Sequence, residues 1–210
     1  MSEHNYKIPG KLVASICELN QWAMDFQGNY ERICESIRIS KSKGATYRLG
    51  PELEVPGYNC QDHFNEIDTI AHGYEILAKI LANPEFHGIV IDLGLPVIHD
   101  GVRYNTRAIC FNGDLIYIRP KTILANDGMY HEERWFVGWK KCVMGDWLVP
   151  EVIYNVIKKV TVPIGVCVLQ FKDVSIGIEM CEELFVPNSV HNLMTMNGAH
   201  VICNGNGSHF

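Results

Sequence analysis

Apolar and polar residues alternate in several short segments of the chain, and this pattern predicts β-strands. The expected strands cover residues 11–19, 47–49, 88–95, 102–111, 115–119, 166–171, 174–180 and 201–203. Three pairs of these strands are separated by short turn sequences, so we expect three β-hairpins. The turns are His99-Asp100-Gly101, Asn112-Gly113-Asp114 and Lys172-Asp173.

Other segments place apolar residues at helical spacing. One helix is expected from an N-cap at Asn29 to about Lys43, a second over residues 67–83, and a third from an N-cap at Ser189 to about Asn197. Residues 150–160 are compatible with a helix or a strand, and we favour a helix. Hairpins together with strand–helix units predict an α/β layered fold, with a mixed sheet or a sandwich of two sheets.

Composition narrows the class of protein. The 210 residues are 47% hydrophobic, enough for the core of one domain or two small ones. A net charge of −6 without a long basic run argues against nucleic acid or an anionic membrane as the main partner. No apolar stretch approaches the ~20 residues of a membrane span, and the polar start is unlike a signal peptide, so we expect a cytoplasmic protein.

The eight cysteines are spaced irregularly, and most lie inside apolar segments. This arrangement predicts reduced, buried thiols. No two cysteines have CxxC spacing, so we predict no structural zinc site and no metal.

Three predicted strands end at residues capable of chemistry. Residues 47–49 lead to Glu52, residues 115–119 lead to Lys121, and residues 174–180 lead directly to Cys181. If the fold joins these ends, a carboxylate could act as a base, a thiol as a nucleophile and an ammonium as an oxyanion stabiliser. Each residue taken alone has a plainer interpretation, as a surface charge or an inert buried thiol.

The segments around these residues resemble a known family. GPELEVPGY, RPKTILANDGMYHEERWF and GIEMCEELFVP are similar, in order and spacing, to the Glu, Lys and Cys motifs of the nitrilase, or carbon–nitrogen hydrolase, superfamily. ELNQWAMDFQGNYERI, YRLGPELE, RYNTRAI and NGNGSH further resemble the glutaminase domain of eukaryotic glutamine-dependent NAD synthetases. The resemblance extends over essentially the whole chain.

This resemblance implies an α-β-β-α sandwich and a Cys–Glu–Lys amidase. It assigns the general base to Glu52, the oxyanion-stabilising cation to Lys121 and the nucleophile to Cys181. Glu54 would face the same side as Glu52 on a strand, but the base of the family directly follows the proline, so Glu52 is preferred.

The resemblance also implies supporting and substrate-binding residues. A second glutamate near the lysine corresponds to Glu132 rather than Glu133, and the backbone N–H of Glu182 would complete an oxyanion hole. Ser208 corresponds to a glutamine-binding serine, and Tyr58 is a pocket-wall candidate that could equally stack in the core.

The implied function is release of ammonia from glutamine through a cysteine thioester, without a cofactor. In the family, a synthetase domain uses this ammonia with ATP and Mg²⁺ to convert deamido-NAD to NAD, and the proteins are oligomers. Residues 1–210 contain no SGGxDS-type phosphate loop, so we expect this chain to lack the synthetase domain. The sequence stops just after the strand that leads to Ser208, so we also expect the last strands of the sandwich to be missing. NGNGSHF replaces the usual NASGSHH, which alters the substrate end of the pocket at Asn206 and Phe210.

Three alternatives remain at this point. The first pairs Cys181 with a histidine in a protease-like site; the candidates are His191, His200 and His209. The second is a stand-alone amidase of the same superfamily, acting on another small amide. The third is a truncated, non-catalytic module that binds or assembles with a partner.

Overall fold

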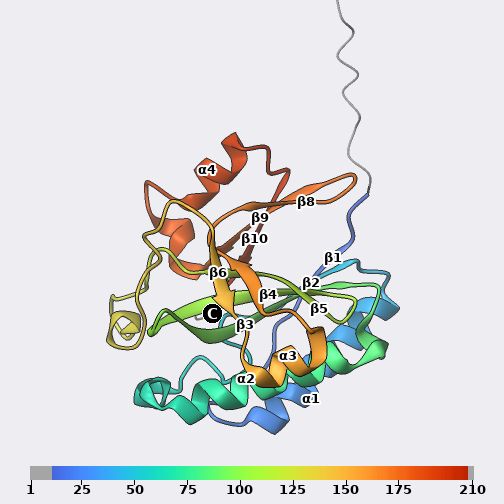
Figure 1. Cartoon of the computed structure of the whole chain (residues 1–210). Helices are drawn as coiled ribbons and strands as arrows, with labels where there is room; N and C mark the ends of the chain where they lie inside the picture. The colour runs from blue at the N-terminus through green and yellow to red at the C-terminus, as the bar shows by residue number, and fades with distance from the viewer. Residues whose placement is uncertain (1–10, 208–210) are drawn as a thin grey trace, which may run out of the picture.

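The computed structural model describes residues 11–207, and its strands form two sheets (Figure 1). The larger has the order β1-β2-β3-β4-β5-β7-β6 and the smaller the order β10-β9-β8. The strands of the larger sheet are β1 (Ala14–Ile16), β2 (Tyr47–Leu49), β3 (Val90–His99), β4 (Val102–Phe111), β5 (Asp114–Pro120), β6 (Gly145–Leu148) and β7 (Thr161–Ile164). Those of the smaller sheet are β8 (Val168–Gln170), β9 (Ser175–Met180) and β10 (Val201–Gly205).

The larger sheet is mixed, as the sequence predicts. β1, β2 and β3 pair in parallel, whereas β3, β4 and β5 form two successive antiparallel hairpins. The turn between β4 and β5 has Asn112 at φ 51° and Gly113 at φ 78°. Both values lie in the left-handed region that an Asn-Gly hairpin turn favours, so the local sequence determines this connection.

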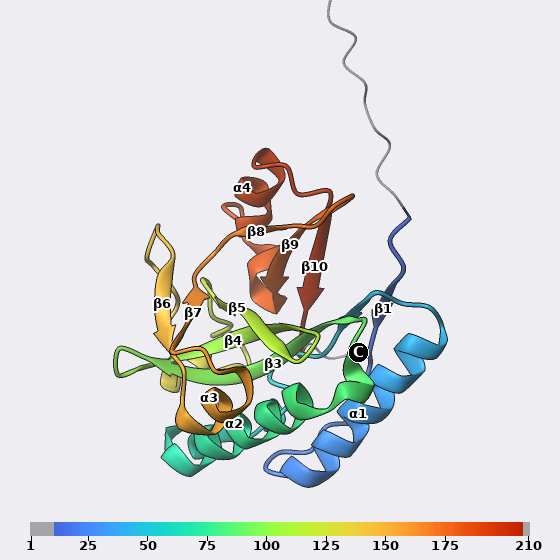
Figure 2. The same cartoon turned by 45° about the vertical axis from the view of Figure 1, so that its right-hand side comes forward.

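Helices cover the outer faces of the two sheets. The helices α1 (Phe26–Ser42), α2 (Ile67–Ala82) and α3 (Glu151–Ile157) lie along one face of the larger sheet (Figures 1 and 2). The smaller sheet faces the other side of the larger one, and α4 (Val190–Met196) lies beyond it. The layers therefore follow the order α-β-β-α, and the predicted α/β sandwich is confirmed.

Two apolar clusters hold these layers together. The first lies between the helices and the larger sheet, and it includes Ile33, Leu77 and Leu93, each with no exposed surface. The second lies between the two sheets and includes Ile109 and Ile178. No helix within residues 11–207 combines the length and apolarity that crossing a membrane requires.

The structure corrects the predicted start of the first helix. Asp25, not Asn29, is the N-cap, and its side chain accepts a hydrogen bond from the backbone N–H of Gly28. Asn29 lies inside α1, fully buried, and its Nδ2 donates to the carbonyl oxygens of Trp22 and Val55. The Asn29 side chain therefore joins two loops to the helix. The cap is provided by Asp25, which directly precedes the first helical residue, Phe26.

Other boundaries differ where tertiary contacts decide them. Residues 11–19 yield only the three-residue strand β1. The favoured helix in residues 150–160 is confirmed as α3, and it ends at Lys158, whose φ of 58° is left-handed. The strands β6 and β7, which pair with each other, were not predicted.

Candidate active site

Glu52, Lys121 and Cys181 all follow strand ends, as the sequence predicts. Glu52 lies in the loop after β2, and Lys121 directly follows β5. Cys181 directly follows β9 and begins the short 3-10 helix η4 (Cys181–Phe185). The three positions come from both sheets, so the site lies where the two layers meet.

Lys121 is the centre of a buried ionic cluster. Its Nζ lies 2.6 Å from Oε1 of Glu52 and 2.9 and 2.8 Å from the two carboxylate oxygens of Glu132. Burial alone would lower the pKa of Lys121, but the Glu52 and Glu132 carboxylates outweigh it and raise that pKa above its usual value. A negative charge on the Cys181 sulfur acts in the same direction on the pKa of Lys121.

Glu52 presents one oxygen to this cluster and leaves the other unbonded. Oε1 accepts hydrogen bonds from Lys121 Nζ and from Asn105 Nδ2, the latter at 2.8 Å. Oε2 is buried and has no hydrogen-bond partner within residues 11–207. A buried carboxylate oxygen without a donor is a proton acceptor, which is what a general base requires.

Glu132, in the 3-10 helix η3 (Glu132–Arg134), forms the other side of the cluster. Its Oε1 accepts a hydrogen bond from the Tyr58 hydroxyl, and its Oε2 accepts one from the backbone N–H of Ala125 at 3.1 Å. Burial first, and then the charge of Glu52, raise the pKa of Glu132. Glu133 is exposed, so Glu132 is the glutamate that the fold directs inward.

Tyr58 is coupled to the same charges. Burial raises the pKa of its hydroxyl, and the Glu52 and Glu132 carboxylates raise it further. The hydroxyl therefore stays protonated and donates to Glu132. Its aromatic ring lies edge-on to Tyr130 at a centroid distance of 6.0 Å.

Cys181 has an unusual backbone conformation. Its φ of 39° is left-handed, a region that residues other than glycine rarely occupy, and only 4% of its surface is exposed. A sharp strand-to-helix turn of this kind presents a nucleophile at the end of a sheet, and such strain recurs at active sites. Glu182, half-buried, is the next residue of the turn.

Glu54 has a different role from Glu52. Its two carboxylate oxygens each accept a 2.7 Å hydrogen bond from the guanidinium of Arg48, and both residues are fully buried. The expectation that Glu52 and Glu54 would share a face applies to a strand. Leu53, between them, has a φ of 50°, so this segment is a turn and the two carboxylates separate.

A buried arginine anchors the loop that leads to Glu52. Arg107 donates to the backbone oxygens of Pro51 at 2.7 Å and Gly50 at 2.8 Å, and its Nε bonds to Asp92 at 2.6 Å. The backbone N–H of Glu52 donates to the carbonyl of Asn206, which joins this loop to the segment after β10. The position of Glu52 is thus determined from both sheets.

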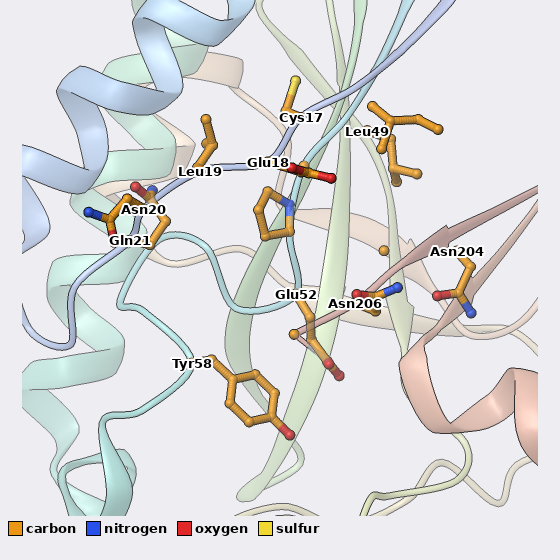
Figure 3. Close-up of a pocket in the computed structure, with 15 residues that line it drawn as sticks. Cys17, Glu18, Leu19, Asn20, Gln21, Leu49, Glu52, Tyr58, Asn204 and Asn206 are labelled. Carbon is orange, nitrogen blue, oxygen red and sulfur yellow. The ribbon is translucent and has the colours of Figure 1, made fainter. Parts of the chain in front are cut away.

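A cavity of about 570 Å³ adjoins the cluster (Figure 3). Glu52 and Tyr58 belong to its wall, and their polar ends point in the same direction. The remaining wall comes from residues 16–21, 49–51 and 204–207. Lys121 has no exposed surface and lies deeper in the protein.

The remaining predicted site residues have other positions. Ser208 and His209 lie outside the described residues. His191 bonds through Nδ1 to Glu179 at 2.9 Å, and His200 bonds through Nδ1 to the backbone N–H of Ser175 at 3.0 Å. These contacts give both rings structural partners and do not support the protease-like alternative.

Sequence reasoning missed two residues that contact the site, Asn105 and Glu183. Asn105 lies in β4 next to Thr106 and Arg107, so its neighbours in the sequence are polar and give no signal that sets it apart. Glu183 has the same side chain as its neighbour Glu182, and only the fold distinguishes them: Glu183 is buried and Glu182 is half-buried. In the described part of the chain, no group of three or more His, Cys, Asp or Glu side chains is arranged to bind a metal ion.

Known proteins similar to this chain include relatives that are much longer than it. The chain is 47% identical over 199 residues to the glutamine-dependent NAD(+) synthetase of Saccharomyces cerevisiae, covering 94% of this chain and 28% of that protein. It is 50% identical over 195 residues to the Dictyostelium discoideum protein of the same name, covering 92% of this chain and 27% of that protein. The chain thus spans little more than a quarter of these curated relatives.

Solved structures and a family profile agree on the fold. A glutamine-dependent NAD(+) synthetase from Cytophaga hutchinsonii superimposes with a TM-score of 0.79 at 29% identity, over 94% of this chain and 30% of that one. An amidase of the nitrilase superfamily from Nesterenkonia AN1 superimposes with a TM-score of 0.70 at 16% identity, over 95% of this chain and 68% of that one. Residues 13–210 match the profile described as carbon-nitrogen hydrolase. The chain therefore belongs to the carbon–nitrogen hydrolase family.

Proposed function

We propose that this chain is the glutamine-hydrolysing domain of a glutamine-dependent NAD synthetase, and that it releases ammonia from the side-chain amide of glutamine. The observation that supports this proposal most directly is the buried cluster around Lys121. There, Glu52 is held through Oε1 while its Oε2 stays unbonded within residues 11–207. The similarity to NAD(+) synthetases over more than nine-tenths of the chain supports glutamine as the substrate.

The proposed first step is acylation of Cys181. Oε2 of Glu52 accepts the thiol proton, and the sulfur attacks the amide carbon of glutamine to form a tetrahedral oxyanion. The positive charge of Lys121 and the backbone N–H of Glu182 stabilise this oxyanion. Glu52 returns the proton to the leaving nitrogen, the carbon–nitrogen bond breaks, and ammonia leaves behind a glutamyl thioester.

The proposed second step is hydrolysis of the thioester. Glu52 removes a proton from a water molecule, which attacks the thioester carbon, and Lys121 stabilises the second oxyanion. The carbon–sulfur bond breaks, glutamate leaves, and the proton on Glu52 restores the Cys181 thiol. Glu132 keeps Lys121 protonated and in place, because its carboxylate pairs with the ammonium at 2.8 Å.

Substrate binding is assigned to the cavity beside Glu52. Its volume of about 570 Å³ exceeds that of a glutamine molecule, and Glu52 and Tyr58 line it. Ser208, which follows the last residues of this wall in the chain, is proposed to bind the substrate.

The proposed partner is an NAD synthetase domain, because the similar proteins are named as NAD(+) synthetases and are more than three times as long. That domain would use the ammonia together with ATP and Mg²⁺, whereas the glutaminase step requires no cofactor. The reduced thiols that the cysteine pattern predicts lead us to place the protein in the cytoplasm. The family resemblance leads us to propose a homo-oligomer.

The test is ammonia release from glutamine by the purified chain, with Cys181→Ala as the matched control. We expect release that depends on Cys181 and a thioester adduct detectable by intact-protein mass spectrometry. If the chain cleaves other small amides but not glutamine, a stand-alone amidase is favoured. No thiol-dependent release from well-folded protein would contradict catalysis by this chain and favour a binding module.

A further inference from the structure

We propose that Glu183 is a positioning residue that fixes the nucleophile Cys181 relative to Lys121. This inference rests on the proposed function. It concerns a carboxylate that is absent from the proposed chemical steps, although it lies only two residues after Cys181 and is fully buried.

Glu183 accepts hydrogen bonds from two separate parts of the site. Its Oε2 accepts from the backbone N–H of Met180 at 2.6 Å. Its Oε1 accepts from the backbone N–H of Thr122 at 2.6 Å, from the Thr122 hydroxyl at 2.5 Å and from Nη1 of Arg119 at 2.7 Å. The Glu183 carboxylate thus accepts four hydrogen bonds.

The positions of these donors show which parts of the site the Glu183 carboxylate connects. Met180 directly precedes Cys181, and Thr122 directly follows Lys121. β9 and β5, which lead to those residues, belong to different sheets, so no β-ladder sets the distance between them. The Glu183 side chain connects the two strand ends next to the reacting groups, and it therefore determines how the thiol and the ammonium face the same substrate carbon.

Only a carboxylate satisfies this arrangement. All four partners are donors, and a glutamine at this position would direct its own N–H₂ group at one of them. Arg119 is also fully buried, so its charge requires a nearby anion. An aspartate would keep the charge but is one methylene too short to reach both strand ends.

The turn that Glu183 anchors is the strained one. Cys181 has a left-handed φ of 39°, which persists only where surrounding contacts enforce it. Without the bond to Met180, the turn would relax and the thiol would move away from Glu52 and Lys121. We therefore expect loss of Glu183 to reduce the reaction rate more than it reduces substrate binding.

The experiment compares Glu183→Gln and Thr122→Val with the unmodified chain. For Glu183→Gln we expect kcat for glutamine to fall roughly 100-fold, the loss associated with a misplacement of about 1 Å, while KM changes little. Thr122→Val removes only one of the four donors, so we expect a smaller fall in kcat in the same direction. Glu183→Asp is expected to recover only part of the lost kcat.

A second measurement does not depend on turnover. The rate at which iodoacetamide alkylates Cys181, followed by peptide mass spectrometry, is expected to fall in Glu183→Gln, because the thiol loses its alignment with Glu52 and Lys121. This measurement separates the proposed function from the proposed role of Glu183. A chain without glutaminase activity contradicts the proposed function, whereas the alkylation rates still test whether Glu183 positions Cys181.

Leu77→Ala, in α2 within the cluster between the helices and the larger sheet, is the matched control for lost stability. We expect it to lower Tm without changing the alkylation rate of Cys181. If Glu183→Gln behaves like Leu77→Ala in both kcat and alkylation, Glu183 is merely structural and the proposal is wrong. If Glu183→Gln does not fold, an unchanged kcat and alkylation rate in Thr122→Val overturns it.

Discussion

The side-chain amide of Asn105 donates a 2.8 Å hydrogen bond to Oε1 of Glu52, the same oxygen that Lys121 contacts. Both donors therefore lie on one side of the Glu52 carboxylate, and Oε2 is the oxygen that stays unbonded within residues 11–207. The backbone oxygen of Asn105 also accepts a hydrogen bond from the backbone N–H of Lys121 at 2.8 Å. Asn105 thus orients the candidate base and anchors the candidate cation.

Asn105→Leu should lower kcat/KM for glutamine by roughly 10- to 100-fold, because a hydrogen bond to a charged group contributes about 1.5–3 kcal/mol. Leucine has a similar volume but cannot donate to Glu52. The assay is ammonia release over a range of glutamine concentrations, with thermal unfolding measured in parallel.

Thr106→Val is the control for Asn105. Thr106 is the next residue of β4, and its hydroxyl donates to the backbone oxygen of Leu95 at 2.6 Å. Its loss removes one buried hydrogen bond without touching Glu52. Equal losses of activity in Thr106→Val and Asn105→Leu would show that Asn105 acts only through stability.

The local pattern of apolar and polar residues is sufficient to predict much of the fold. β2 and β4 have the predicted limits, because alternation and adjacent turn residues determine them. The three strand ends that lead to Glu52, Lys121 and Cys181 were also visible as apolar segments that stop at a reactive residue. The family resemblance then indicated that these ends meet.

The unpredicted parts depend on contacts between distant segments. β6 and β7 are four-residue strands that contain Gly145 and Pro163, residues that weaken a strand signal, and they form by pairing with each other. The role of Glu183 becomes apparent only when β5 and β9 are placed in neighbouring sheets. The pairing of Glu54 with Arg48 likewise depends on the turn at Leu53.

Glu52 and Glu54 should respond in opposite ways to the same substitution. Glu54→Gln leaves the guanidinium of Arg48 buried without its anion, and breaking a buried pair in this way costs roughly 3–5 kcal/mol of unfolding free energy. Glu52→Gln should cost less unfolding free energy, because Lys121 keeps its ion pair with Glu132. The same substitution should abolish ammonia release, because it removes the general base.

Urea unfolding and the ammonia assay on both variants test this contrast. Because the two positions are two residues apart and receive the same substitution, each variant serves as the control for the other. A Glu54→Gln protein of unchanged stability, or an active Glu52→Gln protein, would contradict the assignment of roles.

Lys121→Met should destabilise the protein in a pH-dependent manner. In the unmodified chain the pKa of Lys121 is raised by Glu52 and Glu132 despite its burial, so its contribution to stability is present below the unfolded-state pKa and is lost as pH rises through the folded-state pKa. Without the ammonium, two carboxylates face each other, and protonation of Glu132, whose pKa burial and Glu52 already raise, relieves the repulsion.

The loss of unfolding free energy in Lys121→Met should therefore be larger at pH 8 than at pH 5. Urea unfolding at the two pH values measures it. Lys159→Met is the control, because Lys159 pairs with Asp114 at a site where its side chain is 46% exposed. A loss that is equal at pH 5 and pH 8 would mean that Lys121 does not neutralise Glu52 and Glu132.

Thiol labelling should separate the reactive cysteines from the inert ones. Burial raises the pKa of Cys203 to about 12 and that of Cys60 to about 11. At pH 8 a thiol with a pKa near 12 is ionised to only about one part in 10⁴, and the thiolate is the form that iodoacetamide attacks.

Brief alkylation of the folded chain at pH 8 should therefore modify the exposed Cys142 and leave Cys60 and Cys203 unmodified. Cys181 should also react, because Glu52 accepts its proton, and glutamine should protect it by occupying the same site. Peptide mass spectrometry gives the modified fraction at each position, and denatured protein, in which every cysteine reacts, provides the reference. Labelling of Cys203 as fast as Cys142 would contradict the buried environment, and labelling of Cys181 that glutamine does not slow would contradict its place in the substrate site.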